Sequence, residues 1–363
     1  MKSSNFIYLR GLRHAEHTVF AVNDVQKFYV DPMTGRKMAY SSGQQVKRSI
    51  MEALELPFAA MTFNWEIDKK GVAGMKEPHS PCDPSFTDQL LGGYMKAEKE
   101  TMTVKRRSPL SISAMRPLHP LLGGLELQKE AIVFDRSNKP TQHKVVVSTL
   151  DEKGKRCEIP QEELESWLSS NGRSLGPKFY NGGNNNEGVL TRATGLFSYD
   201  VAIDLRTIFC VSTNKLEPEL FPNIEEKLRN EEWIEGKNIF GNCLICPKGK
   251  REEIIKSLAH ALVNWRITSN QSRTFSLMET VALAISDNAN QIAYAIRGEL
   301  RDDTERQQAV PRIDETAKAD LFISPIASRF IAGSVGSADA LEKAEKKLVD
   351  ILTAFDYENQ LVN

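Results

Sequence analysis

The chain has 363 residues, 40% of them hydrophobic, and its 47 lysines and arginines nearly balance 48 aspartates and glutamates. This length allows one large elaborated domain or two ordinary ones, and the balanced charge excludes any inference of a polyanionic partner from net charge alone. No apolar run is long enough for a leader or a membrane span, and the odd number of five cysteines does not suggest a disulfide framework. We therefore expect a cytoplasmic protein with no membrane partner.

The first third of the chain begins with predicted strands and a helix. Apolar and β-branched runs predict strands at Phe6 to Leu9 and at Thr18 to Val22. Apolar residues at helical spacing predict an amphipathic helix from Gly43 to Leu54, preceded by serines that can cap it. An irregular excursion rich in glycine and proline then covers residues 56–104. Loops this long inside a compact domain are usually functional or disordered.

A second excursion covers residues 123–192 and contains a Gly/Asn tract. Strict alternation of apolar and polar residues predicts a half-buried strand from Phe197 to Leu205. The other predicted elements are strands at Ala131 to Phe134, Lys144 to Ser148 and Thr207 to Val211, and helices at Glu252 to Arg266 and Ala338 to Phe355. Because few strands alternate with helices, we expect an α+β fold with an antiparallel sheet and helices packed on one side.

The start of the first predicted helix is a candidate anion site. The turn sequence Asp31-Pro32-Met33-Thr34-Gly35 leads to Ser41-Ser42-Gly43. There, free backbone N–H groups, two hydroxyls and a glycine that lets a ligand approach could bind an anion. Lys47 and Arg48 follow one turn later. The residues leave open the alternative of a serine-capped surface helix with two solvated cations.

A second basic element is the run Lys105-Arg106-Arg107. Three consecutive cations cannot all lie on one side of a strand, which favours a splayed arrangement around a polyanion. The alternative is a solvated charge run. Arg192 and Arg273 are weaker single candidates for the same role.

The sequence offers few residues for metal binding or catalysis. Cys243 and Cys246 could supply two zinc ligands, but a structural site needs four, so we expect buried cysteines in a strand and no metal or cofactor. No nucleophilic-serine motif, P-loop or dinucleotide fingerprint occurs, so we expect no enzyme. One alternative stays open, because Asp24 or Asp31 beside bound RNA could orient a 2′-hydroxyl for cleavage. Turn formation explains Asp31 equally well.

Several motifs together resemble one protein family. The segments YLRG near the start, then NDVQKF, DPMTGRK, AYSSGQQVKRSI and VKRRSPLSIS, are similar to the DevR branch of the RAMP superfamily, the large backbone subunits of Cascade-type CRISPR complexes. The similarity also touches Thr194 to Phe197 and Ser269 to Arg273. It implies one RRM-like, ferredoxin-type palm over residues 1–363, with a finger-like insertion at 56–104 and a thumb-like insertion at 123–192.

The resemblance also implies a set of RNA-binding residues. Those that match the family's helix start and the loop before it are Ser42, Gln44, Lys47, Arg48, Asn23 and Lys27. Charge alone extends the set to Lys105, Arg106 and Arg107, and we expect the thumb tip at the Gly/Asn tract near Arg192. No pair of aromatic residues stands on a predicted strand, so base stacking of the ordinary RRM kind is not expected.

The resemblance implies a noncatalytic subunit whose copies stack head to tail along a guide RNA as an open filament. We expect it to present that RNA to a target nucleic acid strand beside other Cascade subunits. A second hypothesis keeps the fold but makes the chain an RNA-guided ribonuclease, in which Asp24, ahead of the DPxTG turn, cuts target RNA. A third hypothesis, favoured by the near-neutral charge, is an α+β scaffold without a nucleic acid partner.

Overall fold

The computed structural model describes residues 4–20, 26–67, 73–75, 78–97, 102–128, 132–133, 146–151, 153–160, 162–172, 179–180, 190–268, 274–301 and 307–361. Its contacts divide the chain into two compact units. The first comprises Met1–Glu126 and Thr191–Asn363, and the second comprises Leu127–Leu190. The second unit falls within the segment 123–192 that the sequence marks as an excursion.

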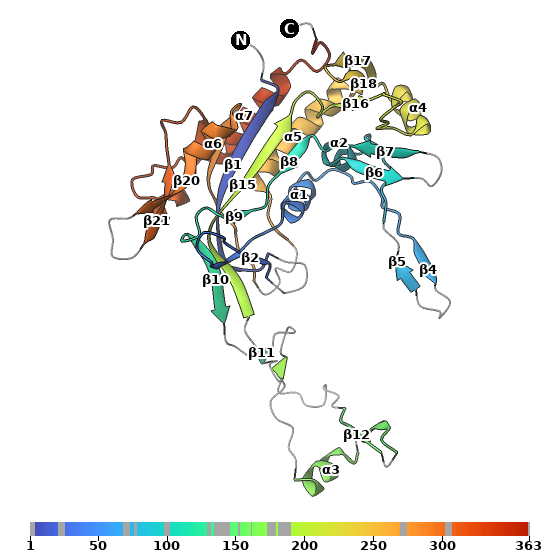
Figure 1. The fold of residues 1–363 in the computed structure, drawn as a ribbon, viewed down its shortest axis with the longest axis vertical. Helices are drawn as coiled ribbons and strands as arrows, with labels where there is room; N and C mark the ends of the chain where they lie inside the picture. Colours follow the sequence, from blue (N-terminus) through green and yellow to red (C-terminus); the bar gives the residue numbers. More distant parts are fainter. Residues whose placement is uncertain are drawn as a thin grey trace. The chain divides into compact units, whose positions relative to one another are not determined.

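An antiparallel sheet is the centre of the first unit (Figure 1). Its strands, in spatial order, are β10 (Gly123–Gln128), β15 (Leu190–Asp204), β1 (Phe6–Thr18), β19 (Thr280–Ser286) and β22 (Asp320–Ile323). Two short strands, β8 (Leu110–Ile112) and β9 (Arg116–Pro117), also pair with β15. Strand β1 runs antiparallel to both of its neighbours. The expected α+β class with an antiparallel sheet is therefore confirmed.

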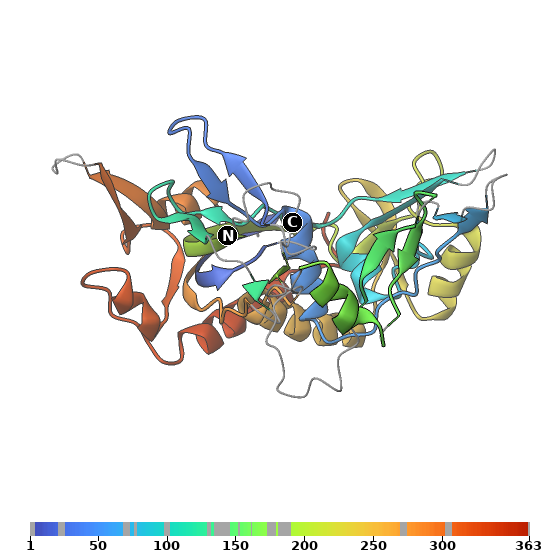
Figure 2. The same cartoon turned by 90° about the horizontal axis from the view of Figure 1, so that it is seen from below.

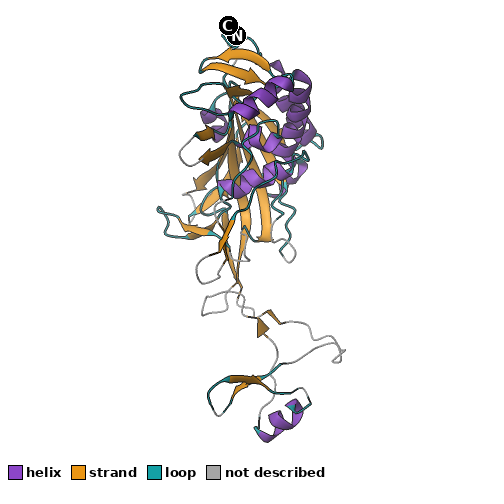
Figure 3. Cartoon of the chain, turned by 90° about the vertical axis from the view of Figure 1, so that its right-hand side faces the viewer, coloured by secondary structure: helices purple, strands orange, loops and turns teal. Residues whose placement is uncertain are grey.

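The three predicted amphipathic helices are confirmed as α1 (Gly43–Glu52), α5 (Lys248–Asn264) and α7 (Ala340–Ala354). They lie on one face of the sheet (Figure 3). The alternation predicted for β15 supplies that face, because the odd-numbered residues from Phe197 to Leu205 are all buried in the same core cluster as the helices. Gly11 is required in β1, since a Cβ there would lie 2.3 Å from the Tyr199 ring.

The opposite face of the sheet has a smaller core. There, Leu12 of β1 and Val281 of β19 pack with α6 (Ala289–Ala295) and the 3₁₀ helix η2 (Pro325–Arg329). Two connections of the chain pass over a neighbouring strand. The connection from β1 to β8 contains α1 and passes β15, which lies between those two strands. The connection from β15 to β19 contains α5 and passes β1.

Four shorter strand predictions are only partly right. Thr18 is the last residue of β1, and Val19 and Phe20 are not in a strand. Two strands are shorter or shifted, β11 (Ile132–Val133) and β12 (Ser148–Leu150). Residues 207–209 form a turn before β16 (Cys210–Ser212), because Ile208 N–H donates back to the Asp204 carbonyl. Ile208 and Phe209 in that turn are buried in the core, so the sequence has the apolar pattern of a strand although these residues form a turn.

The remaining elements of the first unit are two helices and several small sheets. The helices are α2 (Thr87–Gly92) and α4 (Pro222–Asn230), and β16 forms a three-stranded sheet with β18 (Gly241–Ile245) and β17 (Ile234–Asn238). The two-stranded sheets are β2 (Phe28–Val30) with β3 (Lys37–Ala39), β4 (Trp65–Ile67) with β5 (Ala73–Met75), β6 (Tyr94–Ala97) with β7 (Thr103–Arg106), and β20 (Ile296–Arg301) with β21 (Gln308–Ile313). The second unit contains β11 with β14 (Phe179–Tyr180), β12 with β13 (Arg156–Glu158), and α3 (Leu164–Ser170). Among the helices described, none has the length and apolar character to cross a membrane.

Candidate nucleic-acid interface

The β2–β3 hairpin projects from the body of the fold (Figure 2) and ends in the DPMTG turn. The Asp31 carboxylate accepts hydrogen bonds from the Thr34 backbone N–H at 2.9 Å and from the Thr34 hydroxyl at 2.7 Å. These bonds, the hydroxyl's first, hold the pKa of Asp31 below its usual value. Gly35, with φ of 66°, donates its N–H to the Asp31 carbonyl. Asp31 thus holds the turn together, as the turn interpretation predicts.

The surface of this hairpin carries several exposed cations. Lys27, Arg36 and Lys37 are exposed, and Arg116 on the adjacent strand β9 is exposed as well. The Lys37 ammonium lies 5.0 Å from the centroid of the Phe28 ring, and the Arg116 guanidinium lies 4.8 Å from that of Tyr29. Within the described part of the chain, no carboxylate lies at ion-pair distance from any of these four cations. We call Lys27, Arg36, Lys37 and Arg116 the hairpin cations.

The N-terminus of α1 lies beside the hairpin cations. The main chain of Ser41 pairs with Met115, the residue before Arg116. Ser42 is the N-cap, and its hydroxyl accepts from the Gln45 N–H at 3.4 Å. Among the described residues, no acceptor engages the N–H groups of Gly43 and Gln44, and the Gln44 side chain is exposed. The helix start can therefore offer two backbone donors to an anion next to the cations.

The expected role of Gly43 is wrong. A Cβ at this position would lie 2.8 Å from the Ile112 carbonyl oxygen and 3.2 Å from the Ser113 carbonyl carbon. The glycine is needed because the chain's own backbone between β8 and β9 packs against the helix start. It does not open the site to a ligand.

Lys47 and Arg48 differ sharply in their surroundings. The Lys47 ammonium is half-buried and donates to the Gly92 carbonyl at 2.7 Å and to the Ser108 hydroxyl at 2.8 Å. Burial lowers the pKa of Lys47. Arg48 is 78% exposed, and its Nε donates to the Glu52 carboxylate at 2.8 Å. Lys47 therefore ties α1 to the rest of the fold, and Arg48 is the one of the two that faces solvent.

The expectation that all of Lys105, Arg106 and Arg107 splay around a polyanion is wrong for Arg106. Its side chain is buried, with donors engaged by the carbonyls of Leu90, Thr207 and Cys210 and by the Glu219 carboxylate at 3.0 Å. Lys105 and Arg107 are exposed. The strand alternation of β7 separates them from Arg106, because the residue between two outward side chains points inward.

Arg192 does not join this surface, and three further predicted residues cannot be placed on it or off it. Arg192 is buried at the start of β15, where its Nη1 donates to the Thr191 carbonyl at 3.1 Å. Asn23, Asp24 and Arg273 lie outside the described residues, as does the Gly/Asn tract expected to form the thumb tip. Sequence reasoning missed Arg36 and Lys37. The signal was present, since between residues 25 and 51 the only acidic residue is Asp31.

The two cysteines considered as zinc ligands are both buried. Cys243 lies on β18, and Cys246 follows that strand, with its backbone N–H donating to the Phe209 carbonyl. Burial raises the pKa of Cys246 to about 12, so its thiol is neutral near pH 7. Among the residues that the structure describes, no group of three or more His, Cys, Asp or Glu side chains could hold a metal ion.

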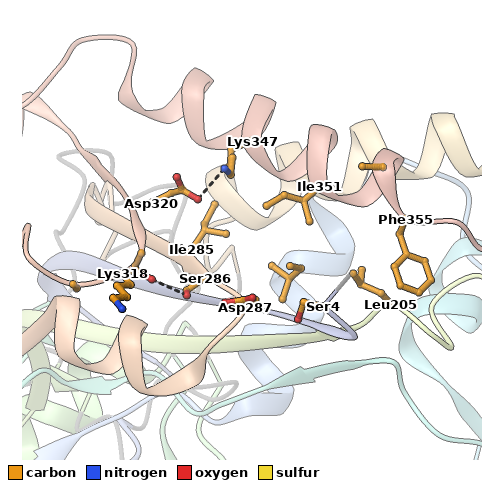
Figure 4. A pocket seen from close by; sticks show the side chains of 14 residues that line it. Ser4, Leu205, Ile285, Ser286, Asp287, Lys318, Asp320, Lys347, Ile351 and Phe355 are labelled. Atoms are coloured by element: carbon orange, nitrogen blue, oxygen red, sulfur yellow. Dashed lines mark hydrogen bonds and ion pairs between the residues drawn. The ribbon is translucent and has the colours of Figure 1, made fainter. Parts of the chain in front are cut away.

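A cavity of about 590 Å³ lies away from these residues, between α7 and the ends of β1, β19 and β22 (Figure 4). Its lining is partly apolar, with Ile285, Ile351 and Phe355 among the side chains drawn. The Lys347 ammonium at its rim pairs with the Asp320 carboxylate at 2.9 Å. Because these opposite charges offset each other, the lining does not indicate whether a ligand would be an anion or a cation.

The comparisons with known proteins include two distant likenesses to solved structures. No protein-family model matches the chain, and a search of curated proteins finds no match. The chain is similar to a solved structure titled "CRISPR RNA-guided surveillance complex, pre-nicking", with 11% identity, a TM-score of 0.41, and coverage of 95% of this chain and 89% of that chain. A second, titled "CRISPR RNA-guided surveillance complex", has 10% identity, a TM-score of 0.36, and coverage of 95% and 84%. Likenesses this low establish neither a shared fold nor a shared function.

Proposed function

We propose that this chain is a subunit of an RNA-guided CRISPR effector complex and that it binds the backbone of the guide RNA with the β2–β3 hairpin and the start of α1. The observation that carries the proposal is the set of hairpin cations. Lys27, Arg36, Lys37 and Arg116 gather on one hairpin and its neighbouring strand without a carboxylate at ion-pair distance among the described residues, in a chain of net charge −1. Unpaired cations on one surface favour a polyanion.

The chemistry of this surface suits phosphates better than base edges. Lysine and arginine side chains bind phosphate oxygens and so fix the register of a nucleic acid without reading its sequence. The N–H groups of Gly43 and Gln44 add backbone donors at a helix N-terminus, which also favour an anion. In such a complex the guide would read the target by base pairing, so contacts to the backbone are sufficient for the protein.

The fold and partners in this proposal follow from the motifs that resemble the RAMP superfamily. The strand order β8, β15, β1, β19, with α1 and α5 crossing on one face, supports an RRM-like palm. In this proposal residues 56–104 act as the finger and residues 123–192 as the thumb. Copies stack head to tail along the guide in the cytoplasm, together with other Cascade subunits and the target strand, and the subunit itself is noncatalytic and needs no cofactor.

The test is RNA binding by the full chain across a salt series. The double variant Lys37→Ala with Arg116→Ala removes two hairpin cations. If each contacts a phosphate, the slope of log affinity against log salt becomes shallower by about 1.4 for a single strand. The matched control is Lys256→Ala with Lys346→Ala, which removes two exposed cations from α5 and α7. The control should keep the wild-type slope.

Each outcome bears on the proposal. A shallower slope for the hairpin variant alone supports backbone binding at this surface. Equal slopes for the two double variants would move the interface elsewhere. No RNA binding by the wild-type chain at low salt, either alone or with partner subunits, would favour the scaffold hypothesis instead.

A further inference from the structure

Arg13 on β1 is a fully buried cation. Its side chain is 1% exposed and lies against the Trp265 ring, with the guanidinium carbon 4.3 Å from the ring centroid. Nη1 donates to the carbonyls of Trp265 at 2.5 Å and Met278 at 3.3 Å, and Nη2 donates to the carbonyl of Val263 at 2.9 Å. Arginine keeps its charge in proteins, so a full positive charge lies inside the fold.

The main chain around Arg13 balances only part of this charge. Val263 lies in the last turn of α5 and Trp265 is its C-cap, where a helix end carries a partial charge of about −0.5. No carboxylate in the described residues lies at ion-pair distance from Arg13, and its Nε has no hydrogen-bond acceptor among them. Buried charges left without a counter-charge are costly, so a second negative group is expected nearby.

A cavity of about 420 Å³ lies beside this arginine. Arg13 forms part of its wall, and the exposed Arg266 lies in its lining as a second cation. Burial lowers the pKa of Arg13, and the nearby positive charge of Arg266 adds to this to a smaller extent. The acidic residue in the lining is Glu279, whose carboxylate lies 3.2 Å from the ring of His14. Asn264, Thr280 and Ser324 provide further polar groups.

This cavity differs from the larger one in Figure 4. There, Lys347 and Asp320 offset each other within the lining. Here, two arginines lie in one lining, and in the part of the chain that the structure describes neither forms an ion pair. The lining contains two arginines and one glutamate, so its net charge is positive.

We propose that this cavity binds a small phosphate-type oxyanion, whose charge completes the balance around Arg13. Phosphate oxygens match guanidinium donors, and Arg266 on the accessible side can contact such an ion directly. The phosphate can be free in solution or can be the terminal group of a nucleic acid. This site is separate from the hairpin cations and does not depend on the function proposed above.

The experiment is thermal unfolding of the full chain in inorganic phosphate and in chloride at equal ionic strength. Binding to the folded state raises the melting temperature steadily with phosphate concentration, because the stabilisation grows with the logarithm of one plus the ligand concentration over its dissociation constant. Arg266→Ala is exposed and so should fold, and it should weaken the apparent phosphate affinity about tenfold, as expected for one charge-assisted hydrogen bond. Arg312→Ala, an exposed arginine on β21, is the matched control and should behave as wild type.

Two further arms separate the sources of the phosphate. A short RNA carrying a 5′-phosphate that competes with inorganic phosphate, where the same RNA with a 5′-hydroxyl does not, identifies a terminal phosphate. Stabilisation by inorganic phosphate without such competition identifies a free ion. Equal melting in phosphate and chloride, or the same response from Arg266→Ala as from wild type, overturns the proposal and leaves the end of α5 as the counter-charge that the described residues offer to Arg13. Because Lys37 and Arg116 lie outside this lining, the hairpin variant should keep its phosphate response even if it loses RNA.

Discussion

The ammonium of Lys47 donates a hydrogen bond to the main-chain carbonyl of Gly92 at 2.7 Å. This bond joins α1 to the end of α2, across 45 residues of chain. The lysine of the motif that resembles an RNA-binding signature is thus engaged inside the protein, and its neighbour Arg48 faces solvent.

Lys47→Ala should therefore lower the free energy of unfolding by about 1–3 kcal/mol, because the Gly92 carbonyl and the Ser108 hydroxyl each lose the hydrogen bond from the ammonium. Arg48→Ala should change it by less than about 0.5 kcal/mol, since an exposed i,i+4 ion pair contributes little. Urea unfolding of the two variants checks both values. Unchanged stability in Lys47→Ala, together with a large loss of RNA affinity, would make Lys47 an RNA contact instead of a structural tie.

Arg106→Ala and Arg107→Ala are variants of two adjacent residues for which we expect very different changes in stability. Removing Arg106 takes a buried charged donor away from the Glu219 carboxylate and from the carbonyls of Leu90, Thr207 and Cys210, which should destabilise the protein by about 3–5 kcal/mol. Removing the exposed Arg107 should change stability by no more than about 0.5 kcal/mol. Denaturant midpoints measure the difference. Similar midpoints for both variants would contradict the buried position of Arg106.

The Asp31 turn should make the hairpin sensitive to acid. Hydrogen bonds from Thr34 lower the folded-state pKa of Asp31, so the stabilisation is present above the unfolded pKa of about 3.9 and is lost as pH falls through the lower folded value. Thr34→Val removes the hydroxyl donor. Its stability deficit relative to wild type should be constant near neutral pH and shrink below about pH 4. A deficit that does not change in acid would mean that Thr34 acts through packing.

Asp24→Ala tests the ribonuclease hypothesis against the noncatalytic one. If the subunit is noncatalytic, an assembled complex containing this variant should handle target RNA as wild type does and should bind guide RNA equally well. Asp31→Asn serves as the control carboxylate, since its effect should be limited to the turn. Loss of target cleavage in Asp24→Ala with retained guide binding would establish the chain as a nuclease.

The long periodic elements could be predicted from the sequence because local pattern and burial agree there. Strand β15 alternates cleanly, and helices α5 and α7 have apolar residues at helical spacing. A strand is predicted at Thr207 to Phe209, where the structure has a turn, because apolar residues can be buried in a turn as well as in a strand. Local sequence does not show which other segments pack over a residue.

The candidate site was predictable only in part. The helix start at Ser42 and the exposed Lys27 follow from local pattern. The burial of Arg106 and the hydrogen bond from Lys47 to Gly92 both depend on carbonyl groups far along the chain, which no local pattern reveals. The contribution of Arg116 depends on the pairing of β9 with β15, a contact between distant segments.

The pairing of β1 has a consequence for synthesis on the ribosome. Phe6 lies opposite Asp204, and Tyr8 lies opposite Ser286, so this central strand is translated before both of the strands that flank it. At about 5–20 residues per second, the first partner strand, β15, is complete only about 10–40 seconds after β1. For that interval the apolar face of β1 has no sheet to join. The nascent chain should therefore depend on chaperones that shield it, and circularly permuted chains that begin between β15 and β19 should fold faster.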